Sequence, residues 1–102
     1  MILFMKTGHV YIIKCSDDSY YTGVTNDPVR RFTEHQKGIG STYTKFRRPL
    51  KLAWVSEEMD IMTAIENEKK VKGWRREKKE ALINGEWEKL PELSTAYWKK
   101  KK

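Results

Sequence analysis

One carboxylate lies at a position where the spacing of apolar side chains predicts burial. Ile61, Ala64 and Ile65 form an apolar stripe at helical spacing, and the stripe continued by one turn reaches Glu68. A carboxylate on a stripe that faces the core raises the free energy of the fold unless it is paired, hydrogen-bonded or bound to a cation. Glu68 is therefore either a cation ligand or a glutamate at the edge of the stripe that pairs with a lysine or arginine. Structural ion pairs are the commoner case.

Charged and phenolic side chains nearer the N-terminus are candidates to work with that carboxylate. Arg31 and His35 are four residues apart, so a helix would present both on one face, although a solvated arginine is the simpler interpretation. Tyr11 and Tyr21 lie in β-rich segments, where a tyrosine is either a functional phenol or an ordinary packing residue. The two phenols share a face of the sheet if an odd number of unpaired residues joins their strands.

The segments that hold the tyrosines and the arginine have clear local signatures. Residues 10–15 and 20–24 are dominated by β-branched and aromatic residues, with turn-forming residues between them, and predict a hairpin. A polar N-cap candidate precedes Pro28, which suits the first helical position, and Gly38 provides a stop. We therefore expect a helix over residues 27–37.

The rest of the chain alternates loop, strand and helical patterns. A stretch rich in Gly, Ser, Thr and cations predicts a loop, the β-rich run after it predicts a third strand, and the apolar stripe predicts a helix that a glycine interrupts. These elements are a loop at residues 38–49, a strand at 50–55, and helices at about 60–72 and 74–84. This order of elements is typical of an α/β domain with a small three-stranded, largely antiparallel sheet flanked by helices.

Length and composition fit one domain. A chain of 102 residues has no room for a second core. We expect residues 8–85 to form the domain and residues 86–102 to form a C-terminal appendage that ends in a lysine tail. The single cysteine, Cys15, excludes an intrachain disulfide and a cysteine-based zinc site. No segment is long enough for a signal h-region or a membrane span, so we expect a cytoplasmic protein without a membrane partner.

The formal net charge of +7 favours a polyanionic partner such as nucleic acid, although the four lysines at residues 99–102 supply part of it. Six other cations are candidates to contact a nucleic-acid backbone without reading its sequence. They are Lys45, Arg47 and Arg48 in the predicted loop, and Lys72, Arg75 and Arg76 in the predicted helices. Tyr43 and Phe46 lie among the loop cations, where they either stack on an unpaired base or belong to a merely solvated loop.

Two tripeptides carry a resemblance to a known family. His9-Val10-Tyr11 and Tyr21-Thr22-Gly23 resemble the two motifs that name the GIY-YIG nucleases. The helix that carries Arg31 and His35, and then Glu68, follow in the order of that family. The resemblance covers residues from 10 to about 83, which is most of the chain. The tyrosines, the arginine and the glutamate in register make it more specific than the tripeptides alone.

The chain departs from the two motifs at three positions, none of which is a proposed catalytic side chain. His9 stands in place of Gly, Val10 in place of Ile, and Thr22 in place of Ile. Further along, Tyr43-Thr44 and Lys78-Lys79 resemble the small stand-alone bacterial members of the family.

The resemblance implies a metal-dependent endonuclease that hydrolyses nucleic-acid phosphodiester bonds, with DNA favoured over RNA. Glu68 would be the sole protein carboxylate on one Mg²⁺ or Mn²⁺. Arg31 would clamp the non-bridging phosphate oxygens. Tyr21, with help from Tyr11, would orient or deprotonate the attacking water, and a base role would require a pKa below the usual phenol value of about 10. His35 would either hold a tyrosine or contact the phosphate.

Two other functions fit the same residues. A non-catalytic nucleic-acid-binding module would bind in a salt-dependent way that neither a chelator nor Glu68→Ala changes. A subunit of a DNA repair complex would receive its substrate from partner proteins. In each case we expect low sequence specificity toward a single-stranded, duplex or branched substrate.

Overall fold

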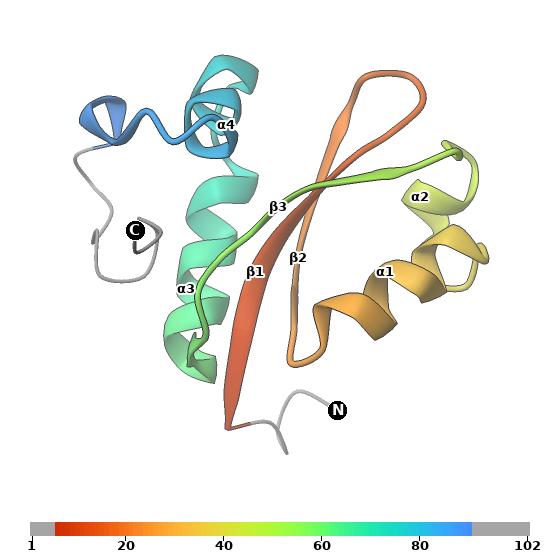
Figure 1. The fold of residues 1–102 in the computed structure, drawn as a ribbon, viewed down its shortest axis with the longest axis horizontal. Coiled ribbons are helices and arrows are strands. Elements are labelled where there is room, and N and C mark those ends of the chain that lie inside the picture. Colours follow the sequence, from red (N-terminus) through yellow and green to blue (C-terminus); the bar gives the residue numbers. More distant parts are fainter. Residues whose placement is uncertain (1–5, 91–102) are drawn as a thin grey trace.

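The computed structural model describes residues 6–90, which form one antiparallel sheet with helices on both faces (Figure 1). β1 (Thr7–Lys14) is the central strand. β2 (Tyr20–Thr25) and β3 (Lys51–Val55) pair with it on either side, and both pairings are antiparallel. The α/β class and the antiparallel sheet expected from the sequence are confirmed.

A fourth strand adds to the three that the sequence predicts. β4 (Met59–Asp60) pairs with the first two residues of β1. Its two residues are too few to show the alternation of a strand, so the sequence pattern assigns Asp60 to the following helix. Asp60 does serve that helix as its N-cap, because its carboxylate accepts a hydrogen bond from the Met62 amide.

The first helix agrees with its sequence signature. α1 (Pro28–Gln36) starts at the proline, and the side chain of Asp27 accepts a hydrogen bond from the Arg30 amide. The predicted loop after it contains α2 (Thr42–Lys45), a single turn capped by Ser41. One turn is too short to show an apolar stripe, which explains why the sequence pattern predicts only a loop there.

The C-terminal half forms three further helical segments. α3 (Ile61–Lys72) ends at Gly73, the glycine that the sequence marks as a break, and α4 (Arg76–Ile83) follows. η2 (Trp87–Lys89) is a 3-10 turn, and Leu90 packs in the same core as α3, so residues 86–90 are part of the packed fold. The rest of the expected appendage, with its lysine tail, lies outside the described residues. Within residues 6–90, no helix has the length and apolar character needed to cross a membrane.

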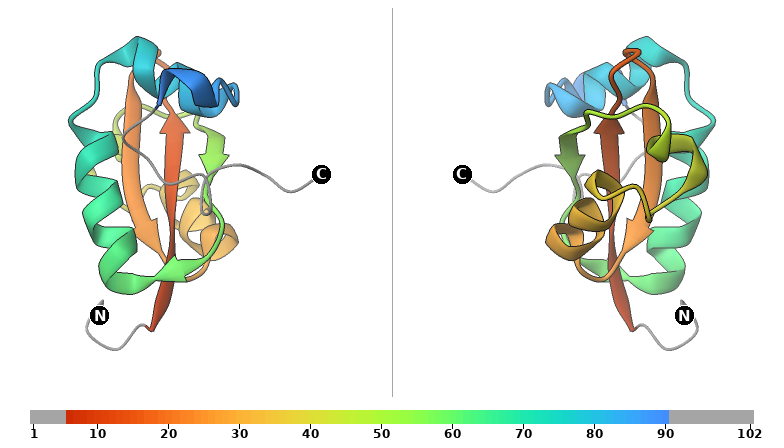
Figure 2. Two further views of the ribbon diagram at one scale, coloured as in Figure 1. Left: turned by 90° about the vertical axis from the view of Figure 1, so that its left-hand side faces the viewer. Right: turned by 90° about the vertical axis from the view of Figure 1, so that its right-hand side faces the viewer.

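The side chains of β1 alternate between two hydrophobic clusters, one on each face of the sheet. Val10 and Ile12 pack in the cluster that α3 and α4 cover, and Tyr11 and Ile13 pack with Phe32 of α1 in the other. Figure 2 shows α3 and α1 on opposite sides of the strands. Val10, Ile12 and Ile13 are fully buried, and each such side chain stabilises the fold by about 1.5–3 kcal/mol. The candidate residues therefore come from elements on both faces of one sheet.

Candidate active site

Tyr11 and Tyr21 lie on the same face of the hairpin, the face that α1 covers. The register pairs Tyr11 with Gly23 and Ile13 with Tyr21, so the two tyrosines are diagonal neighbours across the strands. The connection between the last paired residues is residues 15–19, an odd number, which is the condition for a shared face. The two ring centroids are 6.4 Å apart.

Gly23 leaves the space that the Tyr11 ring occupies. A Cβ atom on Gly23 would lie 2.5 Å from the hydroxyl oxygen of Tyr11 and 2.6 Å from the ring carbon that carries it. Any side chain at this position would therefore displace the phenol. The glycine of the second tripeptide thus allows the tyrosine of the first to lie across the neighbouring strand.

Tyr11 begins a buried chain of hydrogen bonds that runs through α1 to α2. Its hydroxyl oxygen lies 2.9 Å from Nε2 of His35, and Nδ1 of His35 lies 2.7 Å from Oγ1 of Thr44. Oγ1 of Thr44 in turn lies 2.9 Å from Oγ of Ser41, the N-cap of α2. Three elements therefore hold one phenol in a defined position.

Burial fixes the protonation of both rings in this chain near neutral pH. Burial raises the pKa of Tyr11 to about 12, although the nearby guanidinium of Arg31 opposes the rise. Burial also lowers the pKa of His35 to about 4, and the charge of Arg31 adds to that effect. A neutral imidazole has one donor and one acceptor, so Tyr11 can donate to Nε2 while Nδ1–H donates to Thr44.

The burial of these rings favours one of the two roles expected for His35, holding a tyrosine, over the other, contacting the phosphate. It also disfavours a general-base role for Tyr11. His35 is fully buried, so it holds Tyr11 and cannot contact a phosphate. Tyr11 is 3% exposed, and its pKa is raised where a general base would need it lowered. Tyr21 is only partly buried and its ring packs edge-on against His35, with centroids 5.2 Å apart. It is the phenol that a substrate can reach.

Arg31 extends from α1 with its side chain 32% exposed. Its guanidinium donates to the carbonyl oxygen of Gly40 at 2.8 Å and to Oε1 of Glu34 at 3.0 Å. These bonds engage two of the five N–H groups and hold the planar head in one orientation. The preceding residue, Arg30, is more exposed at 55%, so only Arg31 is held against the tyrosines.

Glu68 lies at the edge of the buried stripe of α3. The fully buried positions of that helix include Ala64 and Val71, and Asn67 is 8% exposed, whereas Glu68 is only partly buried. Burial raises the pKa of Glu68, and the charges of Lys72 and Lys69 oppose the rise. Within residues 6–90, no lysine or arginine forms an ion pair with Glu68 within 4.0 Å. The position of Glu68 agrees with the interpretation of an edge glutamate, but the close ion pair that this interpretation includes is absent among residues 6–90. The interpretation of Glu68 as a cation ligand stays a prediction.

The four principal candidates are linked through Tyr11. Its pKa responds to the charges of Tyr21, Arg31 and Glu68, which come from β2, α1 and α3. Tyr21 lies beside Tyr11, with ring centroids 6.4 Å apart, and the charges of Arg31 and Glu68 act on the Tyr11 hydroxyl. The four candidates, which are far apart in the sequence, are therefore within electrostatic range of one phenol.

Four of the six predicted backbone-contacting cations are engaged within the fold itself: Lys45, Arg47, Arg48 and Arg76. Arg47 lies over the ring of Tyr43, 3.7 Å from its centroid, and pairs with Asp17 at 3.1 Å. Arg76 lies over the ring of Tyr20 and pairs with Glu80 at 3.1 Å. Such contacts stabilise the surface, and they also orient the guanidinium groups.

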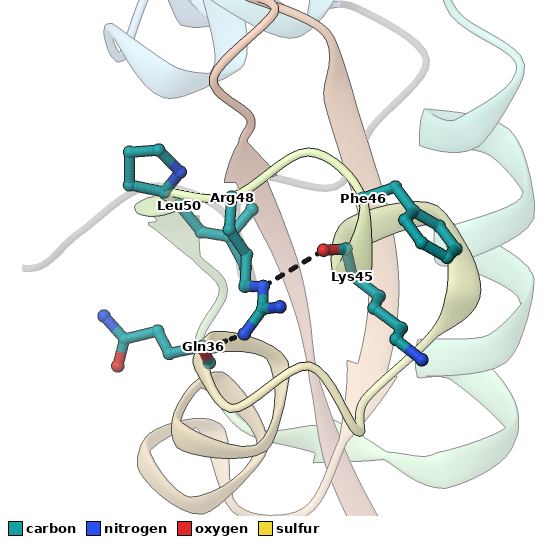
Figure 3. A pocket seen from close by; sticks show the side chains of 6 residues that line it. Gln36, Lys45, Phe46, Arg48 and Leu50 are labelled. Atoms are coloured by element: carbon teal, nitrogen blue, oxygen red, sulfur yellow. Dashed lines mark hydrogen bonds between the residues drawn. The ribbon is translucent and has the colours of Figure 1, made fainter.

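Arg48 joins α1 to α2 (Figure 3). Its guanidinium donates to the carbonyl oxygens of Lys45 and Gln36, at 3.0 and 3.2 Å. Lys45 itself extends over the ring of Phe46, with its ammonium nitrogen 5.4 Å from the centroid. Arg75 is exposed at the start of α4, and Lys72 lines a groove beside Tyr21.

The two loop aromatics, Tyr43 and Phe46, differ in whether their rings are free to stack on an unpaired nucleobase. The ring of Tyr43 is already stacked on Tyr21, with centroids 5.9 Å apart, and is covered by Arg47. It therefore helps to position Tyr21, which the sequence does not predict. Phe46 is 73% exposed and stays a candidate for stacking.

Sequence reasoning misses several residues around the site. Ser41 and Thr44 complete the hydrogen-bond chain, and a serine three residues before a threonine in a polar stretch is a recognisable helix-capping pattern that could have marked them. Lys79 lies in the groove beside Tyr21, and no local pattern distinguishes it from its neighbour Lys78.

The fold is an α/β domain whose candidate side chains come from the β1–β2 hairpin, α1 and α3. A family model described as the GIY-YIG catalytic domain matches residues 7–81. The chain belongs to this family, as its two tripeptides suggest. The domain limits expected from the sequence, residues 8–85, stay a prediction.

Small proteins of the UPF0213 group are similar to the chain. A UPF0213 protein of Halobacterium salinarum is 43% identical over 75 residues, which is 74% of this chain and 97% of the relative. A UPF0213 protein of Staphylococcus aureus is 40% identical over 79 residues, with 78% and 96% covered. The solution NMR structure of a UPF0213 protein from Bacillus halodurans is 36% identical, with a TM-score of 0.46, and the match covers 86% of this chain and 97% of that one.

Proposed function

We propose that this protein is a metal-dependent endonuclease that hydrolyses phosphodiester bonds in nucleic acid, with DNA favoured as the substrate. One observation carries the proposal: Tyr11 and Tyr21 share one face of the hairpin with ring centroids 6.4 Å apart, and the charges of Arg31 and Glu68 reach the Tyr11 hydroxyl. Membership of the GIY-YIG catalytic domain family supports the same reaction class.

The role of Arg31 is to hold the phosphate. A planar guanidinium forms paired hydrogen bonds with phosphate oxygens, and its remaining N–H groups point the charge at the group being cleaved. Because Gly40 and Glu34 already hold the head, little conformational freedom is lost when substrate binds. The charge is also stronger in a partly buried site than in water.

The two phenols have different tasks. Tyr11 stays protonated because of its raised pKa, and its hydrogen bond to His35 fixes a neutral hydroxyl beside the phosphate site. Tyr21 is the more open phenol and orients the attacking water. Its position is held by ring contacts with Tyr11, His35 and Tyr43. Water positioned in this way attacks without the loss of rotational freedom that a free molecule would incur.

Glu68 fits a divalent-cation ligand. It is a partly buried carboxylate with a raised pKa and, within residues 6–90, no ion pair within 4.0 Å, so its oxygens are not engaged by a lysine or arginine and a bound cation would stabilise its charged form. Among the described residues, no three or more His, Cys, Asp or Glu side chains are placed so that they could hold a metal ion together. Water and phosphate oxygens would therefore complete the coordination of a cation bound to Glu68. Mg²⁺ or Mn²⁺ bound there would polarise the scissile phosphate and stabilise the leaving oxygen.

A panel of labelled single-stranded, duplex and branched oligonucleotides tests the proposal. We expect cleavage of at least one substrate with Mg²⁺ or Mn²⁺, and none after a chelator is added. Salt-dependent binding without cleavage in any metal would identify a non-catalytic binding module instead. Absence of both binding and cleavage at low salt would contradict any role on nucleic acid by the isolated chain.

A further inference from the structure

A groove lies along the outer edge of β2, beside the proposed reaction centre. β2 is at the end of the strand order β2-β1-β3, so its outer edge is not covered by another strand among the described residues. Four elements contribute to the groove, which encloses about 370 Å³, within the range of small-ligand sites. The lining residues are Tyr20, Tyr21, Thr22, Tyr43, Lys72 and Lys79.

The groove contains two lysine side chains that form no close ion pair among residues 6–90. Lys72 comes from α3 and Lys79 from α4, and neither has an ion pair within 4.0 Å among residues 6–90. Burial lowers the pKa of Lys79, and the charge of Lys72 adds to that effect. Two ammonium groups that repel each other across a groove favour an anion and exclude a cation.

A buried hydroxyl in the same groove also lacks a partner. Thr22 is 4% exposed, and its Oγ1 atom has no hydrogen-bond partner within the described part of the chain. Buried hydroxyl groups in native proteins are nearly always paired, so the unpaired hydroxyl of Thr22 lowers the stability of this edge of the fold. The charge that favours an anion in the groove comes from the two lysines.

The position of the groove indicates which molecule would supply the anion. Tyr21 lines the groove and also belongs to the proposed reaction centre, and the charge of Lys72 acts on Glu68. Tyr20 is already engaged, because its hydroxyl donates to Glu80 at 3.0 Å. An anion bound by the two lysines would therefore lie next to the phosphate that is cleaved.

We propose that this groove is a phosphate-binding subsite that holds a neighbouring phosphodiester of the substrate strand, with Lys72 and Lys79 as its charged ligands. The inference rests on the proposed nuclease function. It adds a place beside Tyr21 where the strand is held.

The first test measures the lysine side chains directly. The protein, with selectively ¹³C-labelled lysine, is titrated by NMR with a single-stranded oligonucleotide in the presence of a chelator, so that the strand binds without being cut. The Cε signals of Lys72 and Lys79 should shift and the pKa of Lys79 should rise, whereas Lys70, an exposed lysine of α3, should change little. Inorganic phosphate at higher concentration should produce a similar but weaker response, which separates a general anion site from one specific to a strand.

A second test uses the salt dependence of binding. Lys72→Met and Lys79→Met should each reduce the slope of log affinity against log salt concentration by about 0.7, the loss expected for one phosphate contact with a single strand. Lys70→Met removes the same charge outside the groove and should reduce the slope by much less. Methionine keeps the aliphatic stem, so the fold should be preserved.

The outcomes separate this inference from the proposed function. If the oligonucleotide binds while the Lys79 signal stays unchanged, or if all three variants reduce the slope equally, the subsite is disproved and the nuclease proposal is unaffected. If phosphate moves Lys79 and the oligonucleotide does not, the groove binds a free anion and is no substrate subsite. If the wild-type protein binds a strand through Lys79 but never cleaves it with metal, the subsite stands and the nuclease proposal fails.

Discussion

The two sides of the β1–β2 hairpin are built in opposite ways. Under α1, the polar groups around Tyr11 are paired with one another, from its hydroxyl through His35 and Thr44 to the cap of α2. Along the outer edge of β2, Glu68 and the groove lysines have no ion pair within 4.0 Å in the described residues, and the hydroxyl of Thr22 has no partner there.

The hydrogen-bonded groups under α1 therefore keep Tyr11 in position, whereas the unpaired groups along β2 are the ones that can bind a ligand. The closed side satisfies its own hydrogen bonds, so it gives rigidity and needs nothing further. The open side keeps charges that its own fold does not balance, an arrangement that costs stability and is typical of binding sites. Substitutions on the two sides should therefore differ in kind.

Glu68→Gln should give the largest effect. We expect cleavage to fall at least ~100-fold, because the proposed ligand for the metal loses its charge. Stability at pH 7 should stay equal or rise, since burial raises the pKa of Glu68 and the folded state therefore disfavours the charged carboxylate as pH increases. Initial rates and urea unfolding measure the two quantities. Glu66→Gln, at an exposed position of the same helix, is the control and should alter neither.

Two results for Glu68→Gln would contradict the assignment of this residue to the open side. Near-normal cleavage would remove Glu68 from the reaction, and a clear loss of stability would make it a structural residue.

Arg31→Ala should reduce cleavage by a similar factor, about 100-fold, because the transition state loses a fixed positive charge. Arg31→Lys should recover only part of the rate, since an ammonium cannot form the paired contacts of a guanidinium. Arg30→Ala removes the same charge from the adjacent, more exposed residue and should leave most of the activity. Equal losses for the Arg30 and Arg31 variants would indicate general charge attraction rather than a fixed clamp.

His35 makes the closed side sensitive to acid. Its pKa of about 4 in the folded protein lies below the ordinary value of 6.5, so the unfolded chain binds the proton more tightly and stability falls as pH drops from 6.5 toward 4. The full shift corresponds to about 3 kcal/mol. Urea unfolding at pH 7 and pH 4.5 should reveal this loss in the wild type, and a much smaller one in His35→Gln.

His9→Gln controls for the second histidine of the chain and should keep the full loss between the two pH values. If His35→Gln loses as much stability as the wild type over this range, the buried ring is not the acid-sensitive group.

The smallest effects compare one substitution on the two sides. Thr44→Val removes a buried hydroxyl that bonds to His35 and should lower stability by about 1 kcal/mol. Thr22→Val removes a buried hydroxyl without a partner in the described residues and should raise stability by a similar amount. Thermal or urea unfolding measures both. Equal signs would show that the two hydroxyls have equivalent surroundings.

The sequence predicts the scaffold of the site well, because the scaffold depends on local signals. The N-cap at Asp27, the proline after it and the glycine at residue 73 fix α1 and the end of α3. The hairpin itself is also predicted, but whether Tyr11 and Tyr21 share a face stays open in the sequence until the register shows an odd number of residues in the connection.

What the sequence does not reveal depends on contacts between distant segments. Glu68 is only one turn from the apolar stripe, and nothing local determines whether it turns toward a lysine or toward the tyrosines. The burial of His35 and the stacking of Tyr43 on Tyr21 follow from the way α2 folds back over α1. β4 and α2 are too short to give a periodic signal.

The most direct test of the central claim is the paramagnetic broadening of NMR signals by Mn²⁺. If the open side binds the metal, substoichiometric Mn²⁺ should broaden the amide signals around Glu68 and those of β2 around Tyr21, and Glu68→Gln should abolish the effect. Broadening centred on Asp17 and Asp18 of the hairpin turn, and unchanged in Glu68→Gln, would contradict it.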